Sequence, residues 1–276
     1  MRGLLRNPSF TAGAVLTGLL VVVALVSLLW TPYPTDVIAV PRRFLPSSAE
    51  HWLGTDQLGR DIVSLLMVGA RNSILVGVIA VGIGMTAGVA LGVTASALGG
   101  VFEDIAMRIC DFGFAFPAIL LAIMLAAVFG PSLVISVVAI GIINVPVFAR
   151  LTRAAGNAIW VRPFVLAARA TGKGRLAIAL GHVLPNLAPI IIVQATIEFA
   201  IAILAEAALS YLGLGTQPPQ PSWGRMLNEA QTLLFLAPEL AIYPGLAIGT
   251  AVLGLNLLGD GLRDFTDPRL TRRLRR

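Results

Sequence analysis

Six long apolar stretches constrain the fold of this chain more than any other feature of its sequence. Each holds at least eighteen residues with at most one charged residue among them. A helix rising 1.5 Å per residue needs about 20 apolar residues to cross a hydrocarbon core of about 30 Å. The sequence therefore predicts an all-α membrane protein with six transmembrane helices. The expected spans cover residues 10–30, 72–98, 112–129, 132–149, 187–205 and 240–258.

The remaining composition agrees with a membrane protein. Only 12% of the residues are charged, about half the share of a soluble globular domain. The first stretch follows Arg2 and Arg6 as a signal peptide would, but no small-x-small cleavage site follows it, so it is expected to stay as a helix. The single cysteine, Cys110, excludes an intrachain disulfide, and His51 and His182 are too few for a metal cluster. We interpret His51 and Cys110 as structural residues and predict no bound metal.

The distribution of basic residues predicts the orientation of the six spans. With both termini on the cytoplasmic side, inner segments hold fifteen of the twenty Lys and Arg residues, and outer segments hold five. This asymmetry follows the positive-inside rule. The net charge of +6 is therefore attributed to topology, and no nucleic-acid partner is expected. The tail that carries Arg272, Arg273, Arg275 and Arg276 is expected to bind anionic lipid.

The longest inner loop, residues 153–186, is predicted to form two short helices. Pro163 suits the first turn of a helix, and no breaker follows until Gly172-Lys173-Gly174. A second helical stretch runs from Arg175 to Leu184 and is expected to end before Pro185. Small residues at Ala167, Ala168 and Ala170 would let another surface approach the first helix closely.

Lys173 between two glycines suggests a nucleotide-binding loop, but the required spacing is absent. A P-loop has the form Gly-x4-Gly-Lys-Ser/Thr, because the glycines shape the phosphate cradle and the hydroxyl binds magnesium. Aligned on Lys173, this chain has Ala167 in place of the first glycine and Gly174 in place of the hydroxyl residue. We therefore expect no ATP, magnesium or other cofactor on this chain and no catalytic residue.

The same loop resembles the EAA motif of ATP-binding-cassette (ABC) importer permeases. That motif reads Glu-Ala-Ala, three residues, Gly, nine residues, Ile-x-Leu-Pro. Leu166 stands in place of the glutamate and His182 in place of the isoleucine, and His-x-Leu-Pro-Asn is a form associated with the peptide-permease branch. The matching positions are Ala167, Ala168, Gly172, Leu184 and Pro185.

Three further stretches resemble C-type dipeptide and oligopeptide permeases. They are "HWLGTDQLGRDIVSLLMVGARNSILVG" (51–77), "ILAEAALSYLGLGTQPPQPSWGRML" (203–227) and "LGDGLRDFTDPRL" (258–270). The resemblance implies a type I ABC importer permease fold. Residues 1–71 would form a tail, the first helix and an extracytoplasmic loop. Residues 72–260 would form the permease domain, and 261–276 a basic cytoplasmic tail.

The resemblance also implies partners and a location. A permease of this family sits in the bacterial inner membrane as a multi-pass protein. It pairs with a homologous second permease and two ATP-binding subunits, and an extracytoplasmic binding protein delivers the peptide substrate. In the family, the loop around Ala167, Ala168, Gly172, His182, Leu184 and Pro185 is the coupling element that docks on an ATPase. Relatives of the same branch carry nickel, glutathione or haem, which remain alternative substrates.

Three charged residues before the second span have two interpretations. Asp56, Arg60 and Asp61 are candidate extracytoplasmic contacts for the binding protein. Alternatively they form a capped turn, with Thr55 or Asp56 starting a short helix and Arg60 and Asp61 at the surface.

Two carboxylates, Glu198 within the fifth span and Glu206 directly after residue 205, lie where ionisable side chains are costly. Glu206 is a candidate either for the lining of the translocation path or for a hydrogen-bonded group that packs between helices. In a second hypothesis the chain is a secondary transporter and Glu198 and Glu206 couple it to ions, although no inverted repeat is evident. Glycines of the second span (Gly77, Gly84, Gly88, Gly92) are expected to pack against neighbouring helices.

Overall fold

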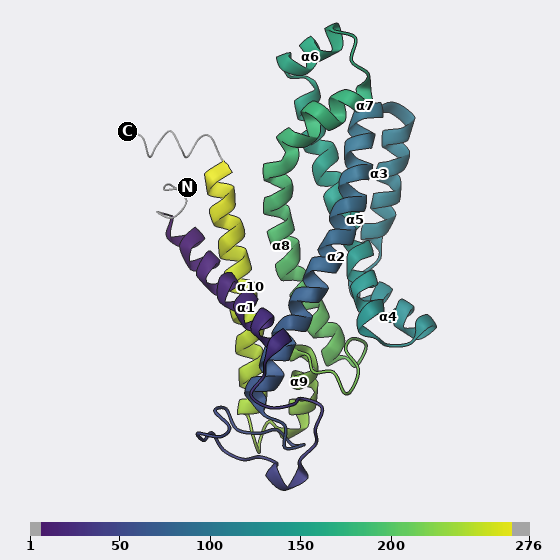
Figure 1. The fold of residues 1–276 in the computed structure, drawn as a ribbon. Coiled ribbons are helices and arrows are strands. Elements are labelled where there is room, and N and C mark those ends of the chain that lie inside the picture. Colours follow the sequence, from purple (N-terminus) through teal and green to yellow (C-terminus); the bar gives the residue numbers. More distant parts are fainter. Residues whose placement is uncertain (1–6, 267–276) are drawn as a thin grey trace.

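The computed structural model describes residues 7–266, and every regular element in that range is helical. Figure 1 shows an elongated bundle in which the long helices run roughly along one axis. In chain order the elements are α1 (Pro8–Leu29), η2 (Val40–Arg42), α2 (Ile62–Leu98), α3 (Gly100–Ala115), α4 (Ala118–Phe129), α5 (Leu133–Trp160), α6 (Pro163–Ala170), α7 (Arg175–Ile178), η3 (Ala179–Val183), α8 (Leu184–Tyr211), α9 (Trp223–Ala230), η4 (Gln231–Leu233) and α10 (Glu239–Thr266).

Within the described residues, five helical segments are each long and apolar enough to cross a membrane. They are α1, α2, α5, the continuous stretch Arg175–Tyr211 that ends with α8, and α10. The pair α3 and α4 supplies a sixth crossing if its two bent halves count as one. The all-helical membrane fold expected from the sequence is thus confirmed.

The expected third span, 112–129, is not one helix. The axes of α3 and α4 meet at 82°, and the break falls at Phe116 and Pro117. Proline disfavours helical geometry in the residue before it, and Phe116 is extended, with φ −90° and ψ 126°. Pro117 therefore ends α3, whereas Pro146 and Pro244 remain inside α5 and α10.

Other helix boundaries also differ from expectation, most of all the start of α2 and the end of α5. Helix α2 begins at Ile62, ten residues before the predicted start, because the Asp61 side chain caps it by accepting a hydrogen bond from Ser64 N. Arg71, expected in an outer loop, therefore lies inside α2. Helix α5 continues past Ala149 to Trp160, so Arg150 and Arg153 lie inside the helix, beyond its apolar part.

Glycines bring the long helices into close contact. A Cβ added to Gly88 or Gly92 of α2 would lie 2.5 Å from Val145 O or 2.3 Å from Ala149 O of α5. On the other side of the bundle, a Cβ on Gly13 of α1 would lie 2.2 Å from Leu258 N of α10. The expectation that glycines of the second span pack against neighbouring helices is confirmed.

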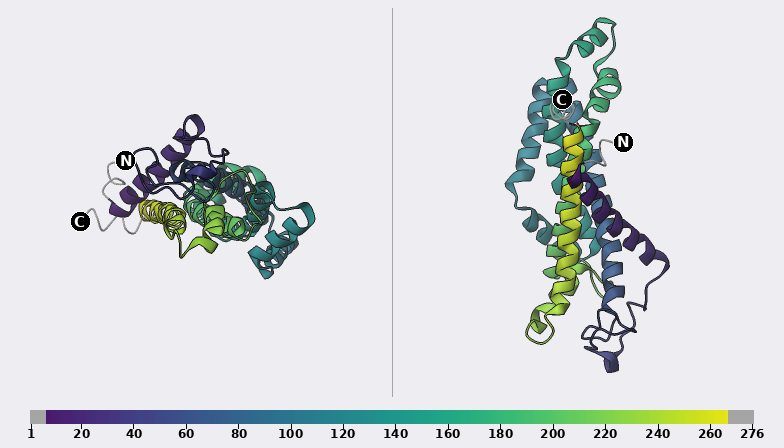
Figure 2. Two further views of the ribbon diagram at one scale, coloured as in Figure 1. Left: turned by 90° about the horizontal axis from the view of Figure 1, so that it is seen from below. Right: turned by 90° about the vertical axis from the view of Figure 1, so that its left-hand side faces the viewer.

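The polar segments gather at the two ends of the bundle. Residues 30–61, which we call the α9-end loop, lie beside α9 at the lower end of Figure 1, and α6 and α7 form the upper end. Two views show α1 beginning and α10 ending toward the α6 end (Figures 1 and 2). Arg2, Arg6 and the basic tail with Arg272, Arg273, Arg275 and Arg276 lie outside the described residues.

Candidate functional site

The loop that resembles the EAA motif projects from the α6 end as a short helix followed by a tight elbow. Helix α6 begins at Pro163, as the sequence predicts, and ends at Ala170. Gly172 has φ +82°, a backbone conformation that favours glycine. Its N–H donates to Arg169 O at 2.9 Å, which closes the last turn of the helix. The glycine of the motif is thus required by the geometry of the elbow.

The two alanines of the motif lie on different faces of α6. Ala168 is 8% exposed and shares the buried face with Val165, three residues earlier and hence on the same side of the helix. Both belong to the main hydrophobic cluster, together with Ile178 and Val183. Ala167 is exposed. This corrects the expectation that Ala167 and Ala168 form one surface for a partner, because only Ala167 points outward.

The second half of the loop was expected to end before Pro185, but it continues past that residue. Helix α7 passes into a π-helical turn, η3, and then into α8 without a break. Leu184 N–H bonds to Ala179 O, five residues earlier. The wider turn precedes Pro185, which has no N–H to donate and tolerates the first turn of a helix. Half-buried His182 sits in η3, and its Nε2 lies 3.3 Å from Lys173 Nζ.

The outward side of the loop combines apolar and cationic side chains. Leu166 is 51% exposed on α6, and Arg175 is anchored by a 2.8 Å hydrogen bond from Nη1 to Leu98 O at the end of α2. We call the exposed set the loop surface: Phe164, Leu166, Ala167, Leu176, Leu180, Arg169, Lys173 and Arg175. Exposed apolar side chains beside cationic ones form a surface that is suited to docking on another protein. No group of three or more potential metal ligands occurs in residues 7–266.

At the opposite end, the three charged residues of the "GTDQLGRD" stretch are buried. Asp61 Oδ2 accepts hydrogen bonds from Ser64 N and Ser64 Oγ at 2.8 and 2.7 Å, and Oδ1 lies 3.0 Å from His51 Nδ1. Asp56 Oδ1 accepts from Arg60 N at 2.8 Å. All three side chains are less than 10% exposed. The geometry places them in a turn before α2, but no short helix starts at Thr55 or Asp56 as that interpretation expected. The cap is Asp61, at the start of α2, and neither Arg60 nor Asp61 is at the surface.

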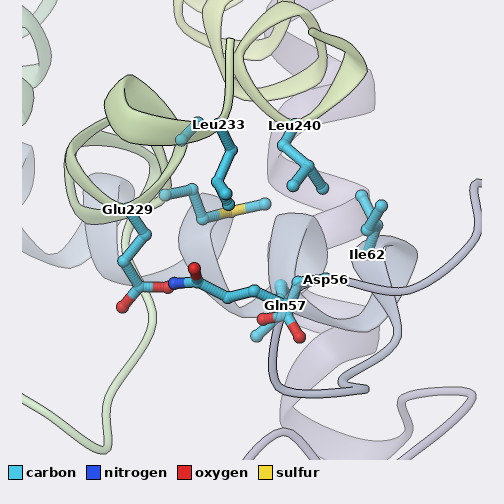
Figure 3. A pocket seen from close by; sticks show the side chains of 9 residues that line it. Asp56, Gln57, Ile62, Glu229, Leu233 and Leu240 are labelled. Atoms are coloured by element: carbon cyan, nitrogen blue, oxygen red, sulfur yellow. The ribbon is translucent and has the colours of Figure 1, made fainter. Parts of the chain in front are cut away.

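Glu229 completes this cluster and was missed at the sequence level. It comes from α9, and its Oε2 lies 2.7 Å from Arg60 Nη2 while its Oε1 lies 2.8 Å from Arg225 Nε. Figure 3 shows Glu229 pointing toward the Asp56–Gln57 turn. The spacing of Arg225 and Glu229, four residues apart on a helix, was the available signal. Nothing in the sequence indicated that Arg60 would be the second partner.

Glu206 is fully buried near the α9 end of α8. Its Oε1 accepts hydrogen bonds from Ser210 Oγ at 2.6 Å and Thr216 Oγ1 at 3.2 Å, and its exposure is 0%. Thr216 lies in the 212–222 connection, so the carboxyl group fastens that connection to α8. Glu198 is buried as well, and Gln194 Nε2 donates to it at 2.8 Å. These placements favour packing between helices over an exposed path lining for both residues.

A small cavity lies beside the charged cluster. It is lined by Asp56, Gln57, Ile62, Leu65, Met226, Glu229, Ala230, Leu233 and Leu240, and Figure 3 shows these side chains around it. Its volume is about 20 Å³, close to the space that one water molecule requires. A peptide does not fit there.

Comparisons with known proteins show which family this chain belongs to. The family described as "Binding-protein-dependent transport system inner membrane component" matches residues 80–272. The glutathione transport system permease protein GsiD of Pectobacterium atrosepticum is 47% identical over 227 residues, which cover 82% of this chain and 74% of the relative. The dipeptide transport system permease protein DppC of Alkalihalophilus pseudofirmus is 46% identical over 223 residues, covering 81% of this chain and 73% of the relative.

A third relative is the glutathione transport system permease protein GsiD of Escherichia coli O1:K1, which is 44% identical over 81% of this chain and 74% of its own length. The resemblance stated from the motifs is therefore confirmed, and the secondary-transporter hypothesis built on Glu198 and Glu206 is wrong. The chain belongs to the family of binding-protein-dependent transport system inner membrane components, with the type I permease fold of ABC importers.

Proposed function

We propose that this permease carries short peptides, with a dipeptide or glutathione as its substrate. The observation that carries this proposal is that relatives at 44–47% identity are named for dipeptide and glutathione transport. Glutathione is itself a tripeptide, so both names describe one chemical class.

The packing of the bundle supports a path between two permease subunits. Helices α2 and α5 meet with no clearance at Gly88 and Gly92, and a Cβ on Gly77 would lie 2.4 Å from Phe199 Cε1 of α8. A peptide cannot pass between helices in such contact without separating them. A homologous second permease, as the family resemblance implies, would supply the other wall of the path.

The loop surface is proposed as the docking site for an ATP-binding subunit. Its four large exposed apolar side chains lie beyond the apolar part of the bundle, where water would otherwise cover them, and their burial on a partner would be favourable. Ala167 and Gly172 leave room for close approach. ATP and magnesium would bind to two such subunits and not to this chain, whose Gly-Lys-Gly lacks the P-loop spacing.

The α6 end is proposed to face the cytoplasm, in the bacterial inner membrane. Among described residues, this end carries Arg150, Arg153, Arg162, Arg169, Lys173, Arg175 and Arg263. The α9 end carries Arg42, Arg43, Arg60, Arg225 and Arg71, whose neighbour Asn72 bonds to Pro221 O just before α9. The excess of cations at the α6 end follows the positive-inside rule, so both chain termini would be cytoplasmic.

The α9-end loop is proposed to meet the extracytoplasmic binding protein. Asp56, Arg60 and Asp61 are too buried to make that contact. The exposed side of the same loop instead presents Trp52, Val37, Ile38, Arg42 and Arg43. Tryptophan and arginine are enriched at energetically important protein contacts.

The substrate class can be tested on the complete complex with its own binding protein. We would measure ATP hydrolysis in lipid nanodiscs while titrating a dipeptide, glutathione, a longer peptide, nickel or haem. Stimulation by the dipeptide or by glutathione is expected. Stimulation by nickel or haem, with none by the dipeptide or by glutathione, would refute the proposed peptide substrate.

A further inference from the structure

Four charged side chains form a chain of ion pairs between the α9-end loop and α9. Arg60 lies between Asp56 and Glu229, with N–O distances of 2.6 and 2.7 Å, and Arg225 reaches the other oxygen of Glu229 at 2.8 Å. The side chains are 8 to 22% exposed. Two anions offset two cations, which lets the cluster remain buried, and removing one member would leave an unpaired charge inside.

The two ends of α9 contact different parts of the molecule. At its start, Trp223 Nε1 donates to Leu66 O at 3.0 Å, and a Cβ on Gly224 would lie 2.1 Å from Ala207 O of α8. Its last turn carries Glu229, which faces Arg60 and the 20 Å³ cavity. The first turn is therefore fixed by close packing against α2 and α8. The last turn is packed as well, since Ala230 is 2% exposed and Asn228 Nδ2 donates to Tyr211 O at 2.7 Å, and the ion pair of Glu229 with Arg60 connects this turn to the α9-end loop.

Backbone hydrogen bonds connect the exposed part of the α9-end loop to the turn that holds Arg60. Ala39 N donates to Leu58 O at 2.9 Å, Phe44 N to Asp56 O at 3.2 Å, and Thr55 N to Leu45 O at 3.1 Å. Residues 39–45 and the turn at 55–58 therefore form one unit. A displacement of the exposed residues would move Arg60, and Arg60 holds Glu229.

We propose that Glu229 is a positioning residue that passes the docking of the binding protein from the α9-end loop to α9. From α9 the chain continues through η4 into α10, so the displacement reaches a membrane-spanning helix within a few residues. This inference rests on the proposed function, because the binding protein is the partner that pushes on the loop.

The test uses the complete complex in nanodiscs, with basal ATP hydrolysis and its stimulation by the binding protein measured for each variant. In Glu229→Gln we expect unchanged basal activity and an unchanged half-stimulating concentration of binding protein. Maximal stimulation should fall about tenfold, the effect of a coupling energy usual within one ion-pair network. Arg60→Gln should behave alike, and the double variant should be no worse than either single one, because both remove the same pair.

Arg225→Gln is the matched control. It removes the other ion pair of Glu229 but keeps the link to Arg60, so stimulation should stay near that of the unmodified complex. If Glu229→Gln lowers the unfolding temperature of the complex, Arg60→Lys is tested in its place. Lysine keeps the positive charge but cannot bond to Asp56 and Glu229 with a planar fork. A folded Arg60→Lys complex should also lose maximal stimulation.

Full stimulation of a folded Glu229→Gln or Arg60→Lys complex would overturn the proposal. A raised half-stimulating concentration with full maximal stimulation would overturn it as well, since that pattern belongs to a docking residue. An unmodified complex that fails to respond to its binding protein would instead contradict the proposed function.

Discussion

Adjacent alanines on α6 provide a sharp test of the loop surface. Ala167 is exposed, whereas Ala168 is 8% exposed within the hydrophobic cluster that contains Val165 and Ile178. The same substitution, alanine to arginine, should therefore act through two different mechanisms. Ala167→Arg should impair docking of the ATPase, and Ala168→Arg should impair the folding of the loop itself.

The expected magnitudes differ for the isolated chain and for the complex. In the chain alone, Ala167→Arg is a surface substitution and should change the free energy of unfolding by no more than about 0.5 kcal/mol. In the complex it places an unpaired charge in a buried interface, which should cost about 3–5 kcal/mol. Since 1.4 kcal/mol is a tenfold change in affinity, binding of the ATPase should weaken by about two to four orders of magnitude. Ala168→Arg should destabilise the chain itself by several kcal/mol, on the order of a buried unpaired charge.

The assay is co-purification of the ATPase subunits on a tagged permease, together with thermal unfolding of the permease in detergent. Ala167→Arg should keep its unfolding temperature and lose the ATPase subunits. Ala49→Arg, at an exposed position of the α9-end loop, is the control and should retain them. Wild-type retention of the ATPase by Ala167→Arg would refute the assignment of this face as the docking surface.

Three further predictions concern packing, capping and orientation. Gly88→Ala places a Cβ 2.5 Å from Val145 O and should destabilise the chain by about 1–3 kcal/mol. Gly82→Ala in the same helix meets nothing within 4 Å and should be neutral or stabilising. Equal unfolding temperatures for the two variants would contradict the α2–α5 contact. Asp61→Ala removes the cap of α2 and should lower the free energy of unfolding by about 0.5–2 kcal/mol, whereas Asp36→Ala at an exposed site should leave it unchanged. Unfolding in urea measures both, and an unchanged free energy for Asp61→Ala would count against the cap. Reporter fusions should read extracytoplasmic at Ala49 and cytoplasmic at Gly174, and an external signal at Gly174 would overturn the proposed orientation.

The all-helical membrane fold could be predicted from the sequence because a segment that crosses the bilayer needs about 20 apolar residues and must form a helix to satisfy its backbone hydrogen bonds. The break at Pro117 could not. Pro146 and Pro244 look the same in the sequence and remain within helices. Whether a proline bends a membrane helix depends on the neighbouring helices that satisfy the freed carbonyl groups, and those neighbours are known only in the folded chain.

The candidate site could also be predicted only in part from the sequence. The glycine elbow at Gly172 followed from local chemistry. The different faces of Ala167 and Ala168 did not, because an eight-residue helix with apolar residues all round gives no clear amphipathic pattern. Glu229 was missed because its partner Arg60 lies 169 residues away, and sequence spacing reveals pairs only within one helix.

The central claim, that this chain forms one wall of the membrane path of an ATP-driven peptide importer, is tested most directly by transport into proteoliposomes. The chain would be reconstituted with the second permease, the two ATP-binding subunits and the binding protein, and uptake of a labelled dipeptide or glutathione would be measured. The account predicts uptake that requires ATP and binding protein together and stops when this chain is omitted. Uptake that persists without ATP, or that follows an imposed ion gradient, would contradict it.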